Sequence, residues 1–207
     1  MTLISHKKIS QDVKVLIYEY PFASKVNKDL HKLILEKATP GDRNPNTGRV
    51  QMTSWRCFDE FKIIGQWVKE IVDGFGGKLN PIDVDTYSPP TNVKLIDLWA
   101  QWYDIGDYQI SHSHWPNHWS FCYYVNTPPR SSPMIFDSSR LEIQAQEGQL
   151  LLFPGWVKHS VPPNHGYGRS VISGNFFYDE YGRNIPTINR ILLPPNIIKN
   201  PNDIDIL

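Results

Sequence analysis

Three histidines stand within seven positions in the segment SHSHWPNHW, which spans residues 111–119 of a chain with 7 histidines in all. His112 and His114 are two residues apart, so on a β-strand their side chains project from the same face. Two imidazoles on one face can chelate a metal ion, because a ring nitrogen binds zinc-like ions at about 2.0–2.1 Å. A solvated loop with clustered histidines is the alternative, and the spacing alone does not decide between the two.

Two other residues, later in the chain, could complete such a site. His159 follows a hydrophobic run and a Pro-Gly turn in QLLLFPGWVKHSVPP, and Arg169 opens the next run, RSVISGNFF. If these runs are antiparallel neighbours, both side chains face a common interior. The planar guanidinium of arginine binds carboxylates, so an arginine beside a metal implies an anion between the two cations. The alternative for Arg169 is a solvated strand start.

The composition narrows the class of protein. The 207 residues suit one domain, and 21 Lys+Arg balance 21 Asp+Glu, so the formal charge gives no reason to expect nucleic acid or an anionic membrane as a partner. Cys57 and Cys122 form no CxxC motif and are too few for a disulfide scaffold. The N-terminus lacks the apolar core of a signal peptide, and no run reaches the ~20 apolar residues of a membrane span. We therefore expect a cytoplasmic protein.

Two helices are expected in the first part of the chain. A β-type run at 13–20 precedes a helix that runs from a cap at Asn27 to about Ala38, and a turn-rich loop follows at 39–50. The clearest helix lies within 58–77, where the apolar residues form one stripe and Gly76-Gly77 ends it.

From Val93 onward the sequence changes to short β-type runs separated by Gly, Pro and Asn, at 93–103, 120–126, 133–137, 149–154 and 169–179. Many short strands after two helices predict an antiparallel sandwich or barrel with the helices on one side. We divide the single domain 1–207 into a supporting part, a catalytic core and an extended tail, at 1–90, 91–182 and 183–207.

The stretch from Trp99 to Tyr178 resembles the Fe(II)- and 2-oxoglutarate-dependent oxygenases, in particular the prolyl-hydroxylase-like group and a branch of small oxygenases of this kind. Four pieces carry the resemblance, in the family's order. They are Gly106 six residues before His112, the run YYVN at 123–126, the phrase GQLLLFPGWVKHSVPPN at 148–164, and the strand GRSVISGNF at 168–176.

The resemblance implies a mainly β fold, with a double-stranded β-helix (jelly-roll, cupin-like) core and N-terminal helices packed on one side. It implies a dioxygenase that hydroxylates a small-molecule or peptidyl substrate and decarboxylates 2-oxoglutarate to succinate, with Fe(II) and O2. Position by position, it makes His112 and His159 iron ligands. Arg169 and Tyr124 would bind the far carboxylate of 2-oxoglutarate. The sequence leaves the substrate and the oligomeric state open, with a dimer among the options.

His114 departs from the family pattern, which usually has Asp or Glu at this position. The branch of small oxygenases often shows His there, so the resemblance allows His114 as the remaining metal ligand. Three neutral imidazoles leave the site one unit more positive than two histidines and a carboxylate, and the dianionic cosubstrate can offset this charge. A carboxylate such as Asp107 or Asp137 is the alternative ligand.

Two other functions remain possible. The barrel could be a three-histidine dioxygenase that needs no oxo acid, or a non-catalytic jelly-roll binding module that has lost its metal. Around the site, we expect His118 at the substrate rim and His165 in solvent, while Trp115 and Trp119 either line the entrance or pack against the sheet. The aromatic cavity walls are expected to be Trp99, Trp102, Phe121 and Tyr123, and Asp179-Glu180 to be a solvated strand end.

Overall fold

The structure is a computed structural model, and it describes residues 3–9, 13–39, 48–74 and 93–178. Two helices and twelve strands lie in these residues. The helices are α1 (Ala23–Lys37) and α2 (Lys62–Gly74). The strands are β1 (Leu3–Lys8), β2 (Lys14–Glu19), β3 (Gly48–Arg49), β4 (Gln51–Met52), β5 (Val93–Tyr103), β6 (Tyr108–His112), β7 (Trp119–Asn126), β8 (Met134–Phe136), β9 (Leu141–Ile143), β10 (Gln149–Pro154), β11 (His159–Val161) and β12 (Arg169–Tyr178).

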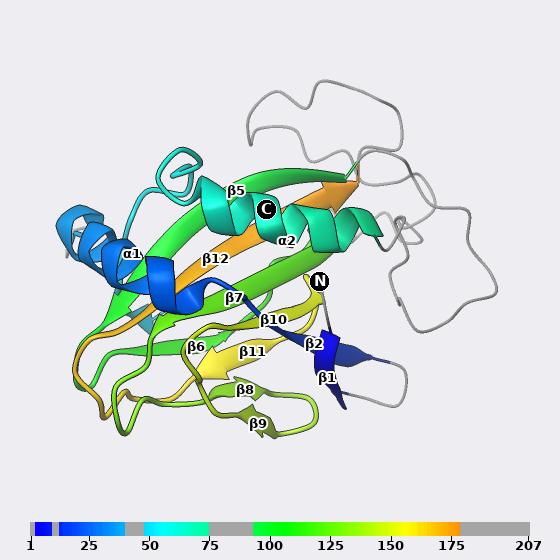
Figure 1. The fold of residues 1–207 in the computed structure, drawn as a ribbon. Coiled ribbons are helices and arrows are strands. Elements are labelled where there is room, and N and C mark those ends of the chain that lie inside the picture. The colour runs from blue at the N-terminus through cyan, green and yellow to red at the C-terminus, as the bar shows by residue number, and fades with distance from the viewer. Residues whose placement is uncertain (1–2, 10–12, 40–47, 75–92, 179–207) are drawn as a thin grey trace, which may run out of the picture.

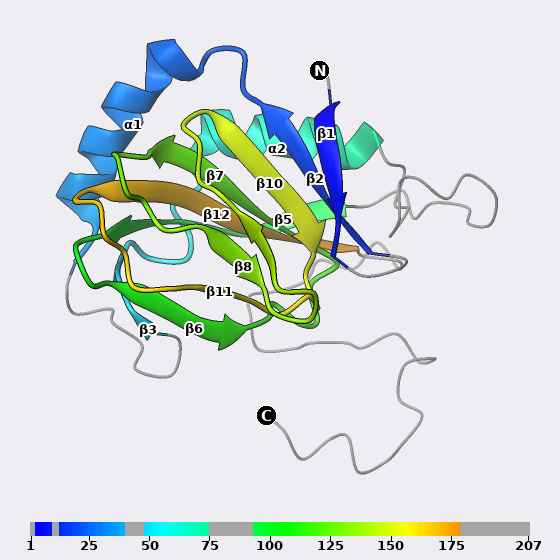
Figure 2. The same cartoon turned by 90° about the horizontal axis from the view of Figure 1, so that it is seen from below.

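The strands form two antiparallel sheets that face each other. The larger has seven strands in the order β1-β2-β10-β7-β12-β5-β4, and the smaller has five in the order β3-β6-β11-β8-β9. Both helices cover the outer face of the larger sheet, and the smaller sheet lies on its other side (Figures 1 and 2). This confirms the predicted fold class, a mainly β jelly-roll core with helices on one side.

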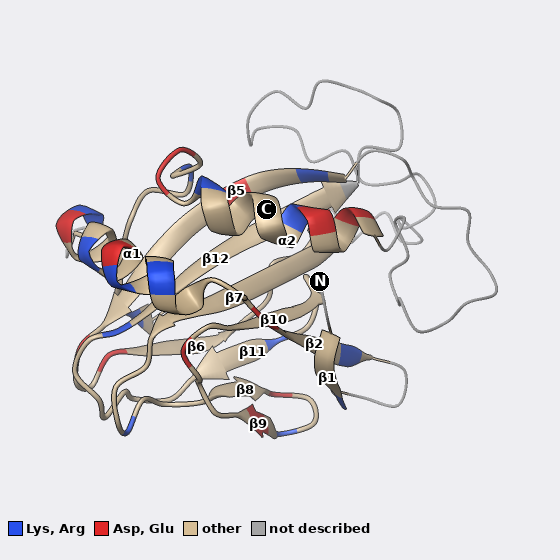
Figure 3. Ribbon diagram, viewed as in Figure 1, with Lys and Arg blue, Asp and Glu red and all other residues tan. Residues whose placement is uncertain are grey.

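The alternation of side chains along the large sheet divides the core into two layers. One layer lies between the sheet and the helices and includes Leu98, Ala100 and Tyr123. The other lies between the two sheets and includes Trp99 and Tyr124. Charged residues gather on the helices, while the strands beneath them are largely uncharged (Figure 3).

Helix α1 begins at another residue than the sequence predicts, whereas α2 lies within the predicted range 58–77. The pattern predicts a cap at Asn27, but α1 begins at Ala23 and Asn27 is buried within the helix. Its side chain accepts a hydrogen bond from the Tyr123 hydroxyl at 2.7 Å and donates one to Glu147 at 3.3 Å, so it ties the helix to the sheet. Helix α2 begins at Lys62, because residues 58–61 form a turn.

Several short strands are absent from the prediction, and part of the prediction lies outside the described residues. Strand β1 is an exposed edge strand, and β6, β9 and β11 are short. The Gly76-Gly77 end of the second helix, Asp179-Glu180 and the tail at 183–207 lie outside the described residues. Within the part that is described, no helix is long and apolar enough to cross a membrane.

Candidate metal centre

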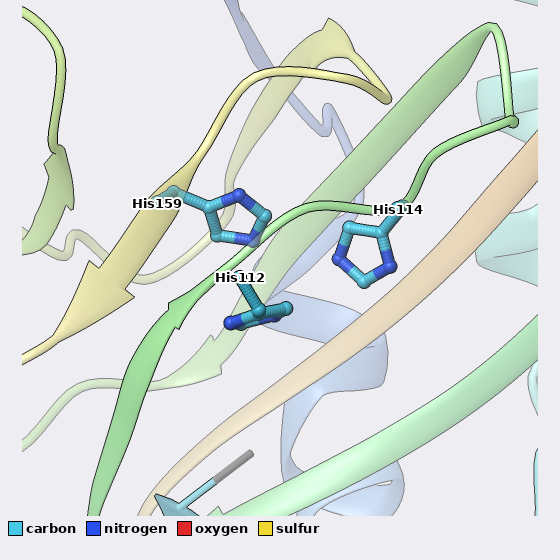
Figure 4. A group of neighbouring side chains, drawn as sticks. All are labelled: His112, His114 and His159. Atoms are coloured by element: carbon cyan, nitrogen blue, oxygen red, sulfur yellow. The ribbon is translucent and has the colours of Figure 1, made fainter. Parts of the chain in front are cut away.

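The structure brings three of the predicted residues together between the sheets. His112 ends β6 and His159 begins β11, and the two are cross-strand partners in the small sheet. His114 lies two residues beyond β6. One ligand atom from each of the three rings lies within 4.8 Å of the others, and Figure 4 shows the rings grouped around a common space. Within the described parts of the chain, these three histidines form the group that could hold a metal ion.

Two of the rings are oriented by their own strands. The Nδ1 atom of His112 lies 2.8 Å from the Ile110 carbonyl oxygen, and that of His159 lies 3.0 Å from the Val157 carbonyl oxygen. A carbonyl only accepts, so Nδ1 carries the proton in both rings and Nε2 keeps its lone pair. Metal-binding histidines characteristically donate their other nitrogen in this way.

The third ring, His114, is held by the turn that follows β6. Its backbone N–H donates to the Gly155 carbonyl at 2.7 Å, and its carbonyl accepts from the Asn117 N–H at 2.8 Å. The ring packs against Trp99 with 5.7 Å between centroids and stacks on His159 at 5.2 Å. The turn therefore places a third imidazole beside the two that the strands provide.

Burial favours the neutral form of all three imidazoles. It lowers the pKa of His112, and that of His159 to about 3, with the neighbouring His112 adding to the latter effect. The pKa of His114 falls well below its usual value because of burial and of the two other rings. Neutral rings are the form that binds metal ions.

Neither alternative carboxylate belongs to this group. Asp107 is buried and accepts hydrogen bonds from Arg49 Nε at 2.7 Å and from the Asp104 backbone N–H at 2.9 Å. Asp137 accepts bonds from the hydroxyls of Ser111 and Ser160, each at 2.7 Å. The oxygens of both carboxylates are thus engaged elsewhere, and His114 is the residue that stands beside His112 and His159.

A buried arginine shares the pocket with the histidines. Arg169 is 0% exposed, and none of its three side-chain nitrogens has a hydrogen-bond partner among the described residues. Its guanidinium carbon lies 4.3 Å from the ring centroid of Tyr103 and 5.5 Å from that of Tyr124. The Tyr124 hydroxyl likewise lacks a partner in the described chain. Buried donors without acceptors are costly, so this corner is suited to an anion.

One pocket contains the three histidines and Arg169. The sequence predicts only some of the residues that line it. Trp99 and Phe121 line it as expected, whereas Trp102 and Tyr123 do not. Trp102 lies on the strand face opposite to Trp99, and Tyr123 on the face opposite to Cys122, so both rings pack toward the helices. The same alternation, counted from Trp99, could have identified Gln101 and Tyr103. The other lining residues are Gln109, Cys122, Met134, Phe153, Val161 and Ser173.

The remaining residues of the segment take different positions. The His118 ring packs on Phe177 at 5.1 Å, and burial lowers its pKa to about 4. His165 is exposed, as expected. Trp119 is 1% exposed and packs in the layer under the helices, whereas Trp115 is 50% exposed. Of the two tryptophans, only Trp115 is thus open to solvent.

Comparison with known proteins identifies the fold. No family model matches the sequence, and no curated protein matches it. Among solved structures, the viral collagen prolyl hydroxylase of Paramecium Bursaria Chlorella virus-1, in its 2-oxoglutarate complex, has a TM-score of 0.56 at 13% identity, over 78% of this chain and 94% of that one.

Two further prolyl hydroxylases are similar to the same extent. A Pseudomonas putida prolyl-4-hydroxylase has a TM-score of 0.54 at 17% identity, over 80% of this chain and 92% of that chain. A Trichoplax adhaerens prolyl hydroxylase, in complex with a hypoxia inducible factor peptide fragment, has a TM-score of 0.56 at 14% identity, over 78% of this chain and 83% of that chain. The chain therefore has the jelly-roll fold of these oxygenases, as the sequence resemblance implied.

Proposed function

We propose that the protein is a non-haem Fe(II)- and 2-oxoglutarate-dependent dioxygenase that hydroxylates a substrate while 2-oxoglutarate is decarboxylated to succinate. One observation carries this proposal above all. A fully buried arginine, Arg169, whose nitrogens have no acceptor in the described residues, lines the same pocket as three converging imidazoles. A pocket that can hold a metal ion at the imidazoles and an anionic group at the arginine fits a dicarboxylic acid that binds the metal with one end and the arginine with the other.

His112, His114 and His159 would hold the iron. Their neutral rings need no deprotonation, and the hydrogen bonds of His112 and His159 to backbone carbonyls direct the Nε2 lone pairs away from the strands. When bound, the ferrous ion would supply the redox chemistry that couples decarboxylation of the oxo acid to C–H hydroxylation. The chain's own contribution would be to supply three ligand atoms that converge in one pocket and to fix their orientation.

Arg169 and Tyr124 would hold the far carboxylate of 2-oxoglutarate. The guanidinium offers a planar pair of donors and the tyrosine a hydroxyl, so both groups would gain acceptors that they lack among the described residues. The Tyr103 ring lies against the guanidinium and fixes its plane. The two negative charges of the acid would offset the charge that a three-histidine site leaves on the metal.

The substrate would approach past the tryptophans. Trp99 packs between His114 and Trp55, with 4.4 Å between the two tryptophan ring centroids, and Trp55 is 45% exposed. A surface aromatic ring that leads to a buried one beside the metal ligands provides a flat apolar path. It would suit a peptidyl or small-molecule substrate, and a peptide fragment is bound in the Trichoplax relative.

The testing experiment is anaerobic reconstitution of the protein with Fe(II), followed by O2 and 2-oxoglutarate. We expect succinate to form only when both Fe(II) and the oxo acid are present, even without the substrate, at a low uncoupled rate. Consumption of O2 without 2-oxoglutarate would instead support a three-histidine dioxygenase. A folded protein that retains no iron would support a non-catalytic binding module.

A further inference from the structure

The small sheet carries two rows of side chains at the level of the metal site, one on each face. His112 and His159 are register partners on β6 and β11, and His159 also pairs with Phe136 on β8. The residue next to each histidine points to the opposite face of the sheet. These residues are Ser111, beside His112, and Ser160, beside His159. The row on the other side therefore lies directly behind the ligand row.

A single carboxylate connects this outer row. Asp137 follows β8, and its Oδ2 accepts the Ser111 hydroxyl at 2.7 Å while its Oδ1 accepts the Ser160 hydroxyl at 2.7 Å. Its backbone N–H donates to the Lys158 carbonyl at 3.1 Å, which places it beside β11. Hydroxyl–carboxylate bonds of this length are strong, charge-assisted bonds. Asp137 thus joins the strands that bear His112 and His159 at the residues next to these ligands.

The strands need such a connection because their own pairing is weak. Strand β11 has three residues, and its register with β6 shifts between His159 and Val161. A short ladder with an irregular register gives few hydrogen bonds to set the distance between the strands. The distance between His112 and His159 depends on this ladder, so the bridge through Asp137 acts where the geometry of the site is least constrained.

The charge of Asp137 also acts on the site. Its carboxylate accepts a hydrogen bond from the residue next to each ligand, on the face behind His112 and His159. A negative charge at this place favours a cation bound between the ligands. Asp137 is half-buried, so solvent screens part of this effect.

We propose that Asp137 is a positioning residue for the metal centre, which holds β6 and β11 at the spacing that His112 and His159 need and supplies from the outer face the carboxylate that the three-histidine set lacks. This inference rests on the metal-binding part of the proposed function. It does not depend on 2-oxoglutarate or on the substrate. Loss of an outer-shell partner typically weakens metal binding roughly 10- to 100-fold.

Three variants separate the bonds from the charge. Asp137→Asn removes the charge but keeps groups that can hydrogen-bond to both serines. The double variant Ser111→Ala/Ser160→Ala removes the two hydrogen bonds but keeps the charge. Asp137→Ala removes both the bonds and the charge. Glu142→Gln is the matched control, because it removes an exposed carboxylate from β9 of the same sheet. For each full-length variant, the Kd of Co(II) is measured by anaerobic calorimetric titration, and the Tm of the metal-free protein is measured by circular dichroism.

We expect Asp137→Ala to weaken Co(II) binding by about 10- to 100-fold, each of the partial variants to weaken it less, and Glu142→Gln to bind as the wild type does. The loss of Co(II) affinity should exceed what any fall in the Tm of the metal-free variants accounts for, which a purely structural role of Asp137 would not produce. Co(II) affinities within twofold of the wild type in all three variants would overturn the inference. Wild-type protein that binds no Co(II) would end both proposals, whereas protein that binds Co(II) but forms no succinate would end only the proposed reaction.

Discussion

His112 and His159 face each other across the β6–β11 pair, with 4.5 Å between their ring centroids and each Nδ1 bonded to a carbonyl of its own strand. Two of the three candidate ligands are thus placed by sheet register. His114 is different, because a turn positions it.

Replacement of Arg169 by leucine should remove 2-oxoglutarate binding without loss of stability. The guanidinium is fully buried, its nitrogens have no acceptor in the described chain, and its neighbours are the Tyr103 and Tyr124 rings, so an apolar side chain removes a poorly compensated charge from the core. We expect the Tm of the ligand-free protein to stay equal or rise. The Kd of 2-oxoglutarate in Mn(II)-loaded protein should rise by about 30-fold or more, since breaking a buried charge pair costs roughly 2–5 kcal/mol.

Arg169→Lys is the control for charge, because lysine keeps the cation without the planar pair of donors. Its 2-oxoglutarate affinity should lie between those of the wild type and Arg169→Leu. If Arg169→Leu binds the oxo acid as the wild type does, the arginine is not its anchor. If the leucine variant instead unfolds at a markedly lower temperature, Arg169 has a structural partner.

The neighbouring tyrosines Tyr123 and Tyr124 should respond in opposite ways to loss of their hydroxyls. The Tyr124 hydroxyl is buried without a partner in the described residues, so Tyr124→Phe should leave the Tm unchanged and weaken 2-oxoglutarate binding about tenfold or more, as for a lost bond to a charged group. The Tyr123 hydroxyl donates to Asn27 at 2.7 Å. Tyr123→Phe should therefore destabilise the protein by about 1 kcal/mol and leave 2-oxoglutarate affinity unchanged.

Calorimetric titration with 2-oxoglutarate and urea unfolding, applied to both variants, check this pair. The two measurements should separate the variants completely, since one hydroxyl lies in the pocket layer and the other in the helix layer. Equal effects of the two substitutions on 2-oxoglutarate affinity would contradict the assignment of Tyr124.

His114 should be necessary for metal binding and replaceable by a carboxylate. His114→Ala removes one of three ligand atoms, so the Kd of Co(II) should rise by more than the roughly 10- to 100-fold that loss of an outer-shell partner costs. His114→Asp should keep much of the affinity, because two histidines and a carboxylate are a well-known set for ferrous iron. Anaerobic titration measures both, and unchanged binding by His114→Ala would show that another group completes the site.

The fold and much of the site could be predicted from the sequence because their signals are local. The apolar stripe of α2 and the hydrophobic run of β10 have the periods of a helix and of a buried strand. The four sequence pieces that flank His112 and His159 lie in order along the core. Strands β6 and β11 carry no such signal, since they are short and rich in polar residues, and they form by pairing with each other within the small sheet.

The errors concern the faces of strands and contacts between distant residues. Trp102 and Tyr123 have the composition of cavity walls, but the side to which a strand residue points depends on where the strand meets its neighbours. Asn27 has a residue type that caps helices, yet a long-range bond to Tyr123 places it inside one. The link between Asp137 and the serines beside the ligands depends in the same way on the packing of strands far apart in sequence.

The stability of the metal-free protein should fall in mild acid because His118 and His159 are buried in neutral form. Burial lowers the folded-state pKa of His118 to about 4 and that of His159 to about 3, whereas in the unfolded chain the pKa of both is about 6.5. Below that value the unfolded state binds more protons than the folded state, so stability is full above it and is lost as pH falls toward the folded values.

The part of this effect that belongs to His118 can be isolated by comparison with His118→Gln. Each buried histidine contributes a slope of at most about 1.4 kcal/mol per pH unit, and solvent screening at the partly exposed His118 reduces its share. Urea unfolding of EDTA-treated protein between pH 7.5 and 5 should give a shallower decline for the variant than for the wild type. Because His118 lies outside the group of converging ligand atoms, the variant should still bind Co(II) with wild-type affinity. Parallel pH profiles would mean that the ring is protonated in the folded protein and that burial against Phe177 does not exclude the charge.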